Sequence, residues 1–270
     1  MSTVAHRRIL DTRIDATNYR DATRRITGWA QAGEARYVCV TSVHGVIEAH
    51  EDPALQPVWN ESDLNTPDGM PLVWGLRALG IPEAERVYGP DLTLHVCRAA
   101  AEEGIPIGLY GGTTESLNDF SVFLEQRFPG IDLACQISPP FRPLTDKENE
   151  EYVRQIKESG ARILLVGIGC PKQEKWMAAH KDRLQTVMIG VGAAFDFHSG
   201  RVSQAPNFIR QNGFEWLFRL LSEPSRLWSR YSHIVPKFIG AFGKQLTRHY
   251  LFGSRKTSSQ VRNPTKPSAE

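Results

Sequence analysis

The feature that most constrains the fold is a series of short apolar segments separated by stretches with helical spacing. The apolar segments, rich in Val, Ile and Leu, are residues 35–43, 105–112, 131–138, 162–169 and 186–197. Several are apolar at consecutive positions, which is typical of strands that are buried on both faces. Alternation of such strands with helices predicts a parallel sheet covered by helices on each side, an α/β fold of the Rossmann-like type.

The same patterns predict how the chain is organised. Helices are expected at 44–52, after the Pro67-Asp68-Gly69 turn that opens 65–80, and at 91–104, 113–128, 145–160 and 171–184. Trp59, Trp74 and Trp176 stand among apolar residues and are expected in the core. The predicted divisions are an N-terminal lead with one helix at 1–34, an α/β catalytic domain at 35–212, a helical appendage at 213–253 and a disordered tail at 254–270.

Residues at the strand exits are the candidates for function, because ligands of parallel α/β sheets bind beyond the carboxyl ends of the strands. They are Thr41, Asp68, Gly111, Gly169 and Asp196. Asp68 could act as a general base, or it could only stabilise its turn by bonding to its own backbone. Asp196 could accept a hydrogen bond from a uracil N–H or a ribose hydroxyl, or it could merely cap a turn.

Two further strand exits also have a functional and a structural interpretation. The segment 167–174, GIGCPKQE, could bring backbone N–H groups close to a phosphate, or it could be a plain strand-to-helix turn. The dinucleotide fingerprint is incomplete there, because Lys172 stands where a third glycine is needed. His44 follows the first strand, and a lone histidine at such a place is more often structural than catalytic. The chain has no DxD pair, so arginines and helix termini would have to neutralise a diphosphate without a metal.

Charge is distributed unevenly along the chain. Residues 201–270 hold 12 Lys and Arg against 3 Asp and Glu, whereas the whole chain is only +2. Within this region the basic residues recur at intervals of 7 and 4, which places them on one stripe of a helix about 40° wide; they are Arg219, Arg226, Arg230, Lys237, Lys244, Arg248 and Arg255. Apolar residues cover the opposite side, from Leu227 to Leu246. Pro224 and Pro236 are expected to divide the segment into two or three helices.

This basic amphipathic pattern predicts contact with an anionic membrane surface. The alternative is that the helix packs on the domain and leaves a solvated basic face, and the apolar side could equally pack on another subunit. Nucleic acid is not predicted, since no reader motif accompanies the charge. The four scattered cysteines, the absence of a signal peptide and the lack of a long apolar run predict a cytosolic protein without a spanning helix.

Motifs in one order along the chain resemble the WecG/TagA/CpsF glycosyltransferase family (glycosyltransferase family 26). The motifs are TPDGMPLVW, RVYGPD, GGT, SPPF, GIGCPKQEKW, IGVGAAFDFHSG, RVSQAP and GFEWLFRLLSEPSRLWSRY. The resemblance covers roughly residues 35–240. It implies transfer of a sugar from a UDP-sugar to a polyprenyl-diphosphate-linked saccharide, with inversion and with neither metal nor other cofactor. The products would belong to cell-envelope polysaccharides, exopolysaccharide among them, and the enzyme would lie on the inner face of the cell membrane.

The resemblance also implies roles for particular residues. Asp68 matches the proposed base, and Thr41 and Arg86 match residues of the catalytic centre. Residues expected to contact the nucleotide or the substrate are Gly111, Gly169, Gln173, Asp196 and His44. Arginines expected at the diphosphate and the membrane are Arg219, Arg226 and Arg230.

One departure from the family concerns the sugar contact. Several members carry Asn two residues after the strand-exit threonine, where this chain has Val43 followed by His44. The donor sugar, N-acetylmannosamine, glucuronic acid or another hexose, therefore stays open. Two other classes were considered: a Rossmann-type oxidoreductase or methyltransferase, which would need an intact glycine fingerprint, and a non-catalytic membrane-binding module, which would leave the strand-exit residues without a purpose.

Overall fold

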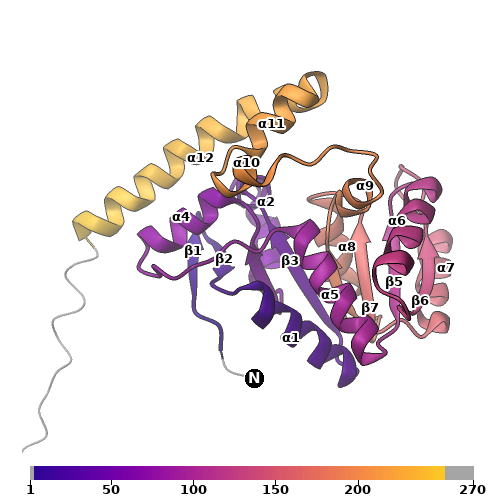
Figure 1. Cartoon of the computed structure of the whole chain (residues 1–270). Coiled ribbons are helices and arrows are strands. Elements are labelled where there is room, and N and C mark those ends of the chain that lie inside the picture. The colour runs from indigo at the N-terminus through magenta and orange to yellow at the C-terminus, as the bar shows by residue number, and fades with distance from the viewer. Residues whose placement is uncertain (1–2, 253–270) are drawn as a thin grey trace, which may run out of the picture.

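Six parallel strands form a sheet in the order β4-β3-β8-β7-β5-β6. Figure 1 shows this sheet lying between helices. The computed structural model describes residues 3–252, apart from the side chains of Asn207, Gln211, Arg226 and Phe252. The strands of the sheet are β3 (Arg36–Thr41), β4 (Leu64–Pro67), β5 (Ile107–Gly111), β6 (Leu133–Ile137), β7 (Ile163–Gly167) and β8 (Val187–Gly190). The predicted disordered tail at 254–270 lies outside the described residues.

Helices cover both faces of this sheet (Figure 1). They are α1 (Tyr19–Gln31), α2 (Val43–Glu51), a 3₁₀ turn (Pro53–Leu55), α3 (Gln56–Asn60), α4 (Met70–Ala78), α5 (Gly89–Glu103), α6 (Thr114–Arg127), α7 (Asp146–Ser159), α8 (Lys172–His180), α9 (Ala194–His198), α10 (Asn207–Gln211), α11 (Glu215–Ser222) and α12 (Pro224–Phe252). The predicted Rossmann-like α/β class is confirmed.

Strand β7 illustrates why the sheet is covered on both sides. Ile163 and Leu165 pack in one core with α1, α5 and α6, whereas Leu164 and Val166 pack in a second core with α7 and α8. All four side chains are fully buried. Burial of each such side chain stabilises the fold by roughly 1.5–3 kcal/mol. The apolar run is continuous because successive side chains pack against helices on opposite faces of the sheet.

An antiparallel hairpin near the N-terminus was not predicted. Strands β1 (His6–Ile9) and β2 (Thr12–Asp15) are joined by Leu10 and Asp11, both with positive φ. Asp15 is fully buried and accepts a hydrogen bond of 2.8 Å from the Asn65 N–H on β4. The expectation of a lead with only one helix was therefore incomplete, because strands of four residues show too little alternation to be recognised.

Strand β4 was also missed, since the sequence predicted only a turn at the start of 65–80. It is four residues long and contains the fully buried polar residues Asn65 and Thr66, so apolar periodicity gives no signal. β4 pairs in parallel with β3, with Thr41 opposite Pro67. This pairing brings Asp68, the next residue, to the carboxyl edge of the sheet.

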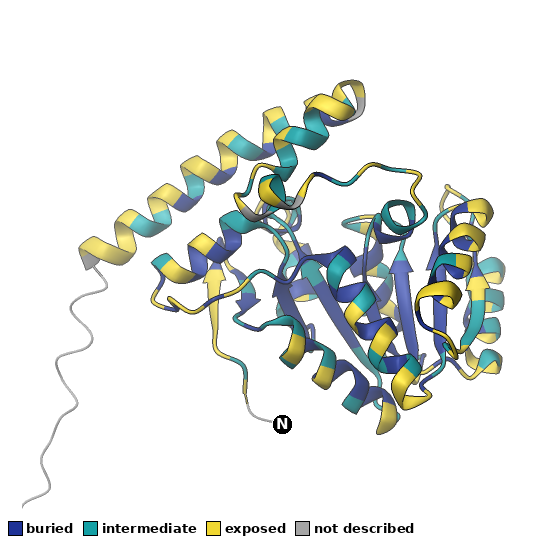
Figure 2. Ribbon diagram, in the orientation of Figure 1, coloured by how far each residue is buried: buried dark blue, intermediate teal, exposed yellow. Residues whose placement is uncertain are grey.

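The C-terminal helix α12 is continuous through Pro236, so the prediction that this proline breaks the segment was wrong. Pro224 does begin the helix. Ile234, Phe238 and Phe242 are buried in a third core with β1, α2 and α4, and their packing offsets the backbone hydrogen bond that an internal proline removes. Figure 2 shows the exposed residues along the outer side of α12. Its predicted apolar side is therefore used in part to pack on the body of the protein.

The three tryptophans that were expected in the core differ in their surroundings. Trp59 is fully buried, as predicted, and Trp176 is half-buried against Tyr110 and His180. Trp74 is 49% exposed, which contradicts the core prediction. It lies on the side of α4 that faces Gly213, where an added Cβ would come within 2.8 Å of the indole ring. None of the helices within residues 3–252 is long and apolar enough to cross a membrane.

Candidate functional site

Asp68 lies at the exit of β4 and is held from three directions. Its backbone N–H donates to the Thr41 carbonyl at 2.8 Å, and its own carbonyl accepts from Arg86 Nε. Its Oδ1 accepts the Gly89 N–H at 2.9 Å, while no described residue donates to Oδ2. Burial raises the pKa of Asp68 from 3.8 to about 6, and Arg86 opposes this rise. The carboxylate is therefore fixed through Oδ1, has no donor to Oδ2 among the described residues, and changes its protonation near pH 6.

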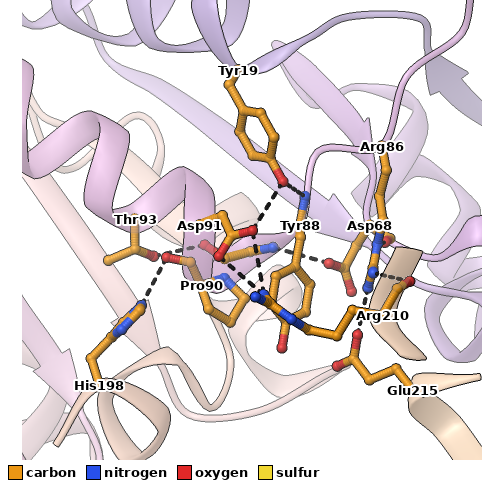
Figure 3. A network of polar contacts seen from close by, with 11 residues as sticks. Tyr19, Asp68, Arg86, Tyr88, Pro90, Asp91, Thr93, His198, Arg210 and Glu215 are labelled. Carbon is orange, nitrogen blue, oxygen red and sulfur yellow. Dashed lines mark hydrogen bonds and ion pairs between the residues drawn. The ribbon is translucent and has the colours of Figure 1, made fainter. Parts of the chain in front are cut away.

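Arg86 connects Asp68 to the C-terminal segment, as Figure 3 shows. Besides the Asp68 carbonyl, its guanidinium donates to the Arg210 carbonyl at 3.0 Å and to Glu215 Oε2 at 2.7 Å. It also lies 4.4 Å from the centre of the Tyr88 ring. Several of its donors are thus already used within the protein.

A second set of contacts extends this network. Arg210 pairs with Asp91 at 3.2 Å, and its guanidinium lies 5.2 Å from the Tyr88 ring. The Tyr19 hydroxyl accepts the Tyr88 N–H at 3.1 Å. Together these residues fasten α10 and α11 to the start of α5 (Figure 3). Sequence reasoning assigned no role to any of them.

The glycines at the exits of β5 and β7 allow these strands to end very close together. Gly111 has φ +124°, and a Cβ on it would lie 2.4 Å from the Gly167 carbonyl oxygen. Gly169 also has positive φ, +85°, but a Cβ there would meet no neighbour within 4 Å. Gly111 is therefore required by packing, whereas Gly169 is required by the backbone conformation.

Gln173 supports the exit of β8. It is 3% exposed, its Oε1 accepts the Gly192 N–H at 3.1 Å, and its Nε2 donates to Glu174 Oε1 at 2.9 Å. Glu174 is 2% exposed, and burial raises its pKa to about 7. The Gln173 amide therefore orders the loop that leads to Asp196, and its predicted contact with the nucleotide stays a prediction.

Asp196 lies on α9, beyond the end of β8. Its Oδ1 accepts a hydrogen bond of 2.7 Å from Ser116 Oγ on α6. Two residues further on, His198 Nε2 lies 2.8 Å from the Pro90 carbonyl oxygen at the start of α5. Helix α9, which carries Asp196, therefore adjoins the start of α5, where the Gly89 N–H holds the Asp68 carboxylate.

Thr41 and His44 are both engaged within the protein. Thr41 is 2% exposed, and its hydroxyl donates to Asn65 Oδ1, so it reaches the site through its backbone carbonyl. His44 Nε2 lies 3.0 Å from Glu48 Oε1. Burial, followed by the charge of Arg230, lowers the pKa of His44. This effect of Arg230 on His44 indicates that the Arg230 guanidinium, on α12, lies near the start of α2.

The C-terminal arginines do not form one continuous stripe. Arg219 lies on α11, which ends before α12 begins, while Arg230 is an exposed residue of α12. The Arg219 guanidinium lies 5.4 Å from the centre of the ring of Phe197, the residue after Asp196, and its Nε is buried without a hydrogen-bond partner among the described residues. The side chain of Arg226 is outside the described part of the chain, as is Arg255. Lys237, a further member of the stripe, pairs with Glu51 of α2.

Comparisons with known proteins identify the family of this chain. The family model described as the glycosyl transferase WecG/TagA/CpsF family matches residues 7–251. The chain belongs to the WecG/TagA/CpsF glycosyltransferase family. One relative in Bacillus spizizenii, an N-acetylglucosaminyldiphosphoundecaprenol N-acetyl-beta-D-mannosaminyltransferase, is 29% identical over 196 residues, which are 72% of this chain and 74% of the relative. This protein is therefore a glycosyltransferase, as the motifs had indicated.

Two residues that sequence reasoning missed belong to this candidate site. Arg210 and Glu215 both contact Arg86, and they follow it by more than 120 residues. Glu215 did carry a signal, since residues 201–270 contain only 3 acids. An isolated acid in a basic segment is a candidate for a specific buried ion pair rather than for solubility.

Proposed function

We propose that this enzyme transfers N-acetylmannosamine from its UDP-sugar to N-acetylglucosamine linked to a polyprenyl diphosphate, with inversion at the anomeric carbon. The observation that carries this proposal is the fixed carboxylate of Asp68, whose Oδ2 has no donor among the described residues and whose pKa is about 6. The choice of sugar and acceptor rests on the name of the Bacillus relative. UDP-glucuronic acid is the second donor to be tested.

In the proposed reaction the acceptor hydroxyl attacks the anomeric carbon of the donor. Asp68 Oδ2 takes the proton of that hydroxyl as the new bond forms, and UDP leaves from the opposite side of the sugar. General-base help of this kind contributes roughly 10²–10⁴-fold. One displacement with the nucleophile opposite the leaving group produces inversion.

The departing diphosphate needs cationic partners, which Arg219 is best placed to supply. Within the part of the chain that the structure describes, its Nε has no hydrogen-bond partner, and its charge lowers the pKa of Asp68. Arginine suits this task because its fork of donors matches phosphate oxygens. Arg86 would act mainly on Asp68, since its guanidinium is already bonded to the protein.

The test is product formation from a panel of donors with a synthetic polyprenyl-diphosphate N-acetylglucosamine acceptor. UDP-N-acetylmannosamine, UDP-glucuronic acid, UDP-N-acetylglucosamine and UDP-glucose are compared, and the anomeric configuration of the product is read by NMR. Thermal protection by UDP but not by NAD or S-adenosylmethionine excludes the other Rossmann-type enzymes. Absence of transfer from every donor, or a product with retained configuration, contradicts the proposal.

We also propose that the C-terminal segment contacts the inner face of the cell membrane, where a lipid-linked acceptor would lie. Apolar side chains are well exposed there: Phe208, Phe214, Leu217, Leu221 and Trp228 range from 38% to 75% exposed. Exposed aromatic and aliphatic residues together with arginines suit an anionic lipid surface. Leu227, Ile234, Phe238 and Phe242 are buried and therefore do not contribute.

Sedimentation with phosphatidylglycerol vesicles tests this contact. The variant Leu221→Ser/Trp228→Ser should bind less than the wild type, because both side chains are exposed and removing them leaves the packed cores intact. Val122→Ser, which alters an exposed residue of α6, is the matched control. Equal binding by all three proteins contradicts the membrane contact.

A further inference from the structure

The guanidinium of Arg86 joins the turn that holds Asp68 to a segment far along the chain. One contact, from Nε, reaches the Asp68 carbonyl, and the other two reach the Arg210 carbonyl and the Glu215 carboxylate. Glu215 is 129 residues away in sequence and is the first residue of α11. The orientation of Arg86 therefore depends on whether α11 is docked.

Glu215 is turned inward rather than toward solvent. Its side chain is 14% exposed and that of Arg86 is 16% exposed, with 2.7 Å between Nη2 and Oε2. A carboxylate buried to this degree without a cation would be costly, so each side chain requires the other. The Tyr88 ring lies against the guanidinium of Arg86 and restricts it further.

We propose that Glu215 is a positioning residue of the catalytic centre, which holds the Arg86 guanidinium where it fixes the Asp68 turn. This inference deepens the proposed function, because it takes Asp68 as the base. It means that the C-terminal segment contributes an acid to the centre as well as arginines. Docking of α11 is then a condition for a correctly placed base.

Charges around Asp68 make this role measurable. The titratable groups that act on Asp68 or are acted on by it are Tyr19, Arg86, Tyr88, Glu215 and Arg219. Of these, Glu215 raises the pKa of Asp68 and the two arginines lower it. Replacing Glu215 by Gln therefore moves the protonation of Asp68 to lower pH if Glu215 is docked beside the centre, whereas that pH would stay unchanged if α11 were not docked there.

The experiment compares Glu215→Gln, Glu215→Ala, Arg86→Ala and the double Arg86→Ala/Glu215→Ala variant. Glu223→Gln removes an acid just beyond the other end of α11 and is the matched control. In Glu215→Gln, kcat should fall on the order of 10- to 100-fold with little change in the KM for the donor, as expected for misplacement of a catalytic group. The acid limb of the pH profile should also move to lower pH. In the Arg86→Ala background, Glu215→Ala should cause no further loss.

Additive losses in the double variant, or an unchanged acid limb in Glu215→Gln, would overturn the proposal. The titration of Asp68 provides a readout that does not depend on turnover. It is followed by NMR of ¹³C-labelled aspartate carboxyls, and the Asp68 resonance is identified because it is missing in Asp68→Asn. A lower pKa of Asp68 in Glu215→Gln supports the docked position of Glu215, on which the inference depends, even if the wild type transfers no sugar, and an unchanged pKa refutes it. Failure of the proposed function and failure of this inference are thereby distinguished.

Discussion

Replacing Asp68 by Asn should abolish transfer and at the same time stabilise the protein at neutral pH. Burial raises the pKa of Asp68 from 3.8 to about 6. At about 1.4 kcal/mol for each tenfold change in acidity, the ionised carboxyl costs the folded state up to ~3 kcal/mol at pH 7. Asparagine avoids this cost, and its side-chain oxygen can still accept the Gly89 N–H. For a chain of this size the gain corresponds to a rise in Tm on the order of 5–10 °C.

The gain in stability of Asp68→Asn over the wild type should depend on pH. Between pH 3.8 and about 6 the folded protein holds a proton on Asp68 that the unfolded chain has lost, so acidification stabilises the wild type but not the variant. The advantage of Asp68→Asn in the free energy of unfolding should therefore be full above pH 6 and vanish toward pH 4.

Two assays test this reasoning. Urea unfolding across pH 4–8 measures the difference in stability, with Asp132→Asn, at an exposed acid, as the control. Transfer should fall roughly 10²–10⁴-fold in Asp68→Asn while UDP still binds, and kcat/KM of the wild type should decline below pH 6. A variant that is no more stable than the wild type at pH 7, or a difference independent of pH, refutes the burial argument. Near-normal turnover would remove Asp68 as the base.

Three further predictions concern the sheet, the C-terminal helix and the absence of a metal. Gly111→Ala should destabilise the protein by ~3 kcal/mol or more, because its Cβ would lie 2.4 Å from the Gly167 carbonyl oxygen, whereas Gly104→Ala, with no neighbour within 4 Å, should cost only the ~1–2 kcal/mol of a left-handed alanine; equal urea midpoints would contradict this. Phe242→Ala should cost ~3–5 kcal/mol by unfolding measurements, since this ring is 8% exposed in the core beneath α12. The exposed Ile239 on the same helix should tolerate alanine, and a comparable loss there would argue against the packing. Transfer should be unchanged after treatment with EDTA, and activity restored only by added Mg²⁺ would show that a cation is needed.

The residues alone predicted five strands of the sheet, all but β4, and the edge of the sheet where the candidate site lies. Runs such as Ile163–Gly167 are apolar at successive positions because each face is covered, and this requirement is visible in the residues alone. The exit position of Asp196 follows from the same pattern, whereas Asp68 was marked only by its Pro67-Asp68-Gly69 turn, since β4 is not recognisable as an apolar run. Short strands with polar buried residues escaped it, as β4 shows, because a residue such as Asn65 bonds through its side chain to the distant Arg13 carbonyl instead of following an apolar period.

Tertiary structure alone decided what surrounds Asp68 and how the C-terminal segment is used. The periodicity of α12 was correct, yet it could not distinguish a helix side facing lipid from one packed on β1, α2 and α4, since both environments favour apolar side chains. The contacts of Arg86 with Arg210 and Glu215 likewise join residues more than 120 positions apart. Local sequence preferences fix the helices and strands, but the energies of such ion pairs depend on burial and geometry that exist only once those elements have docked.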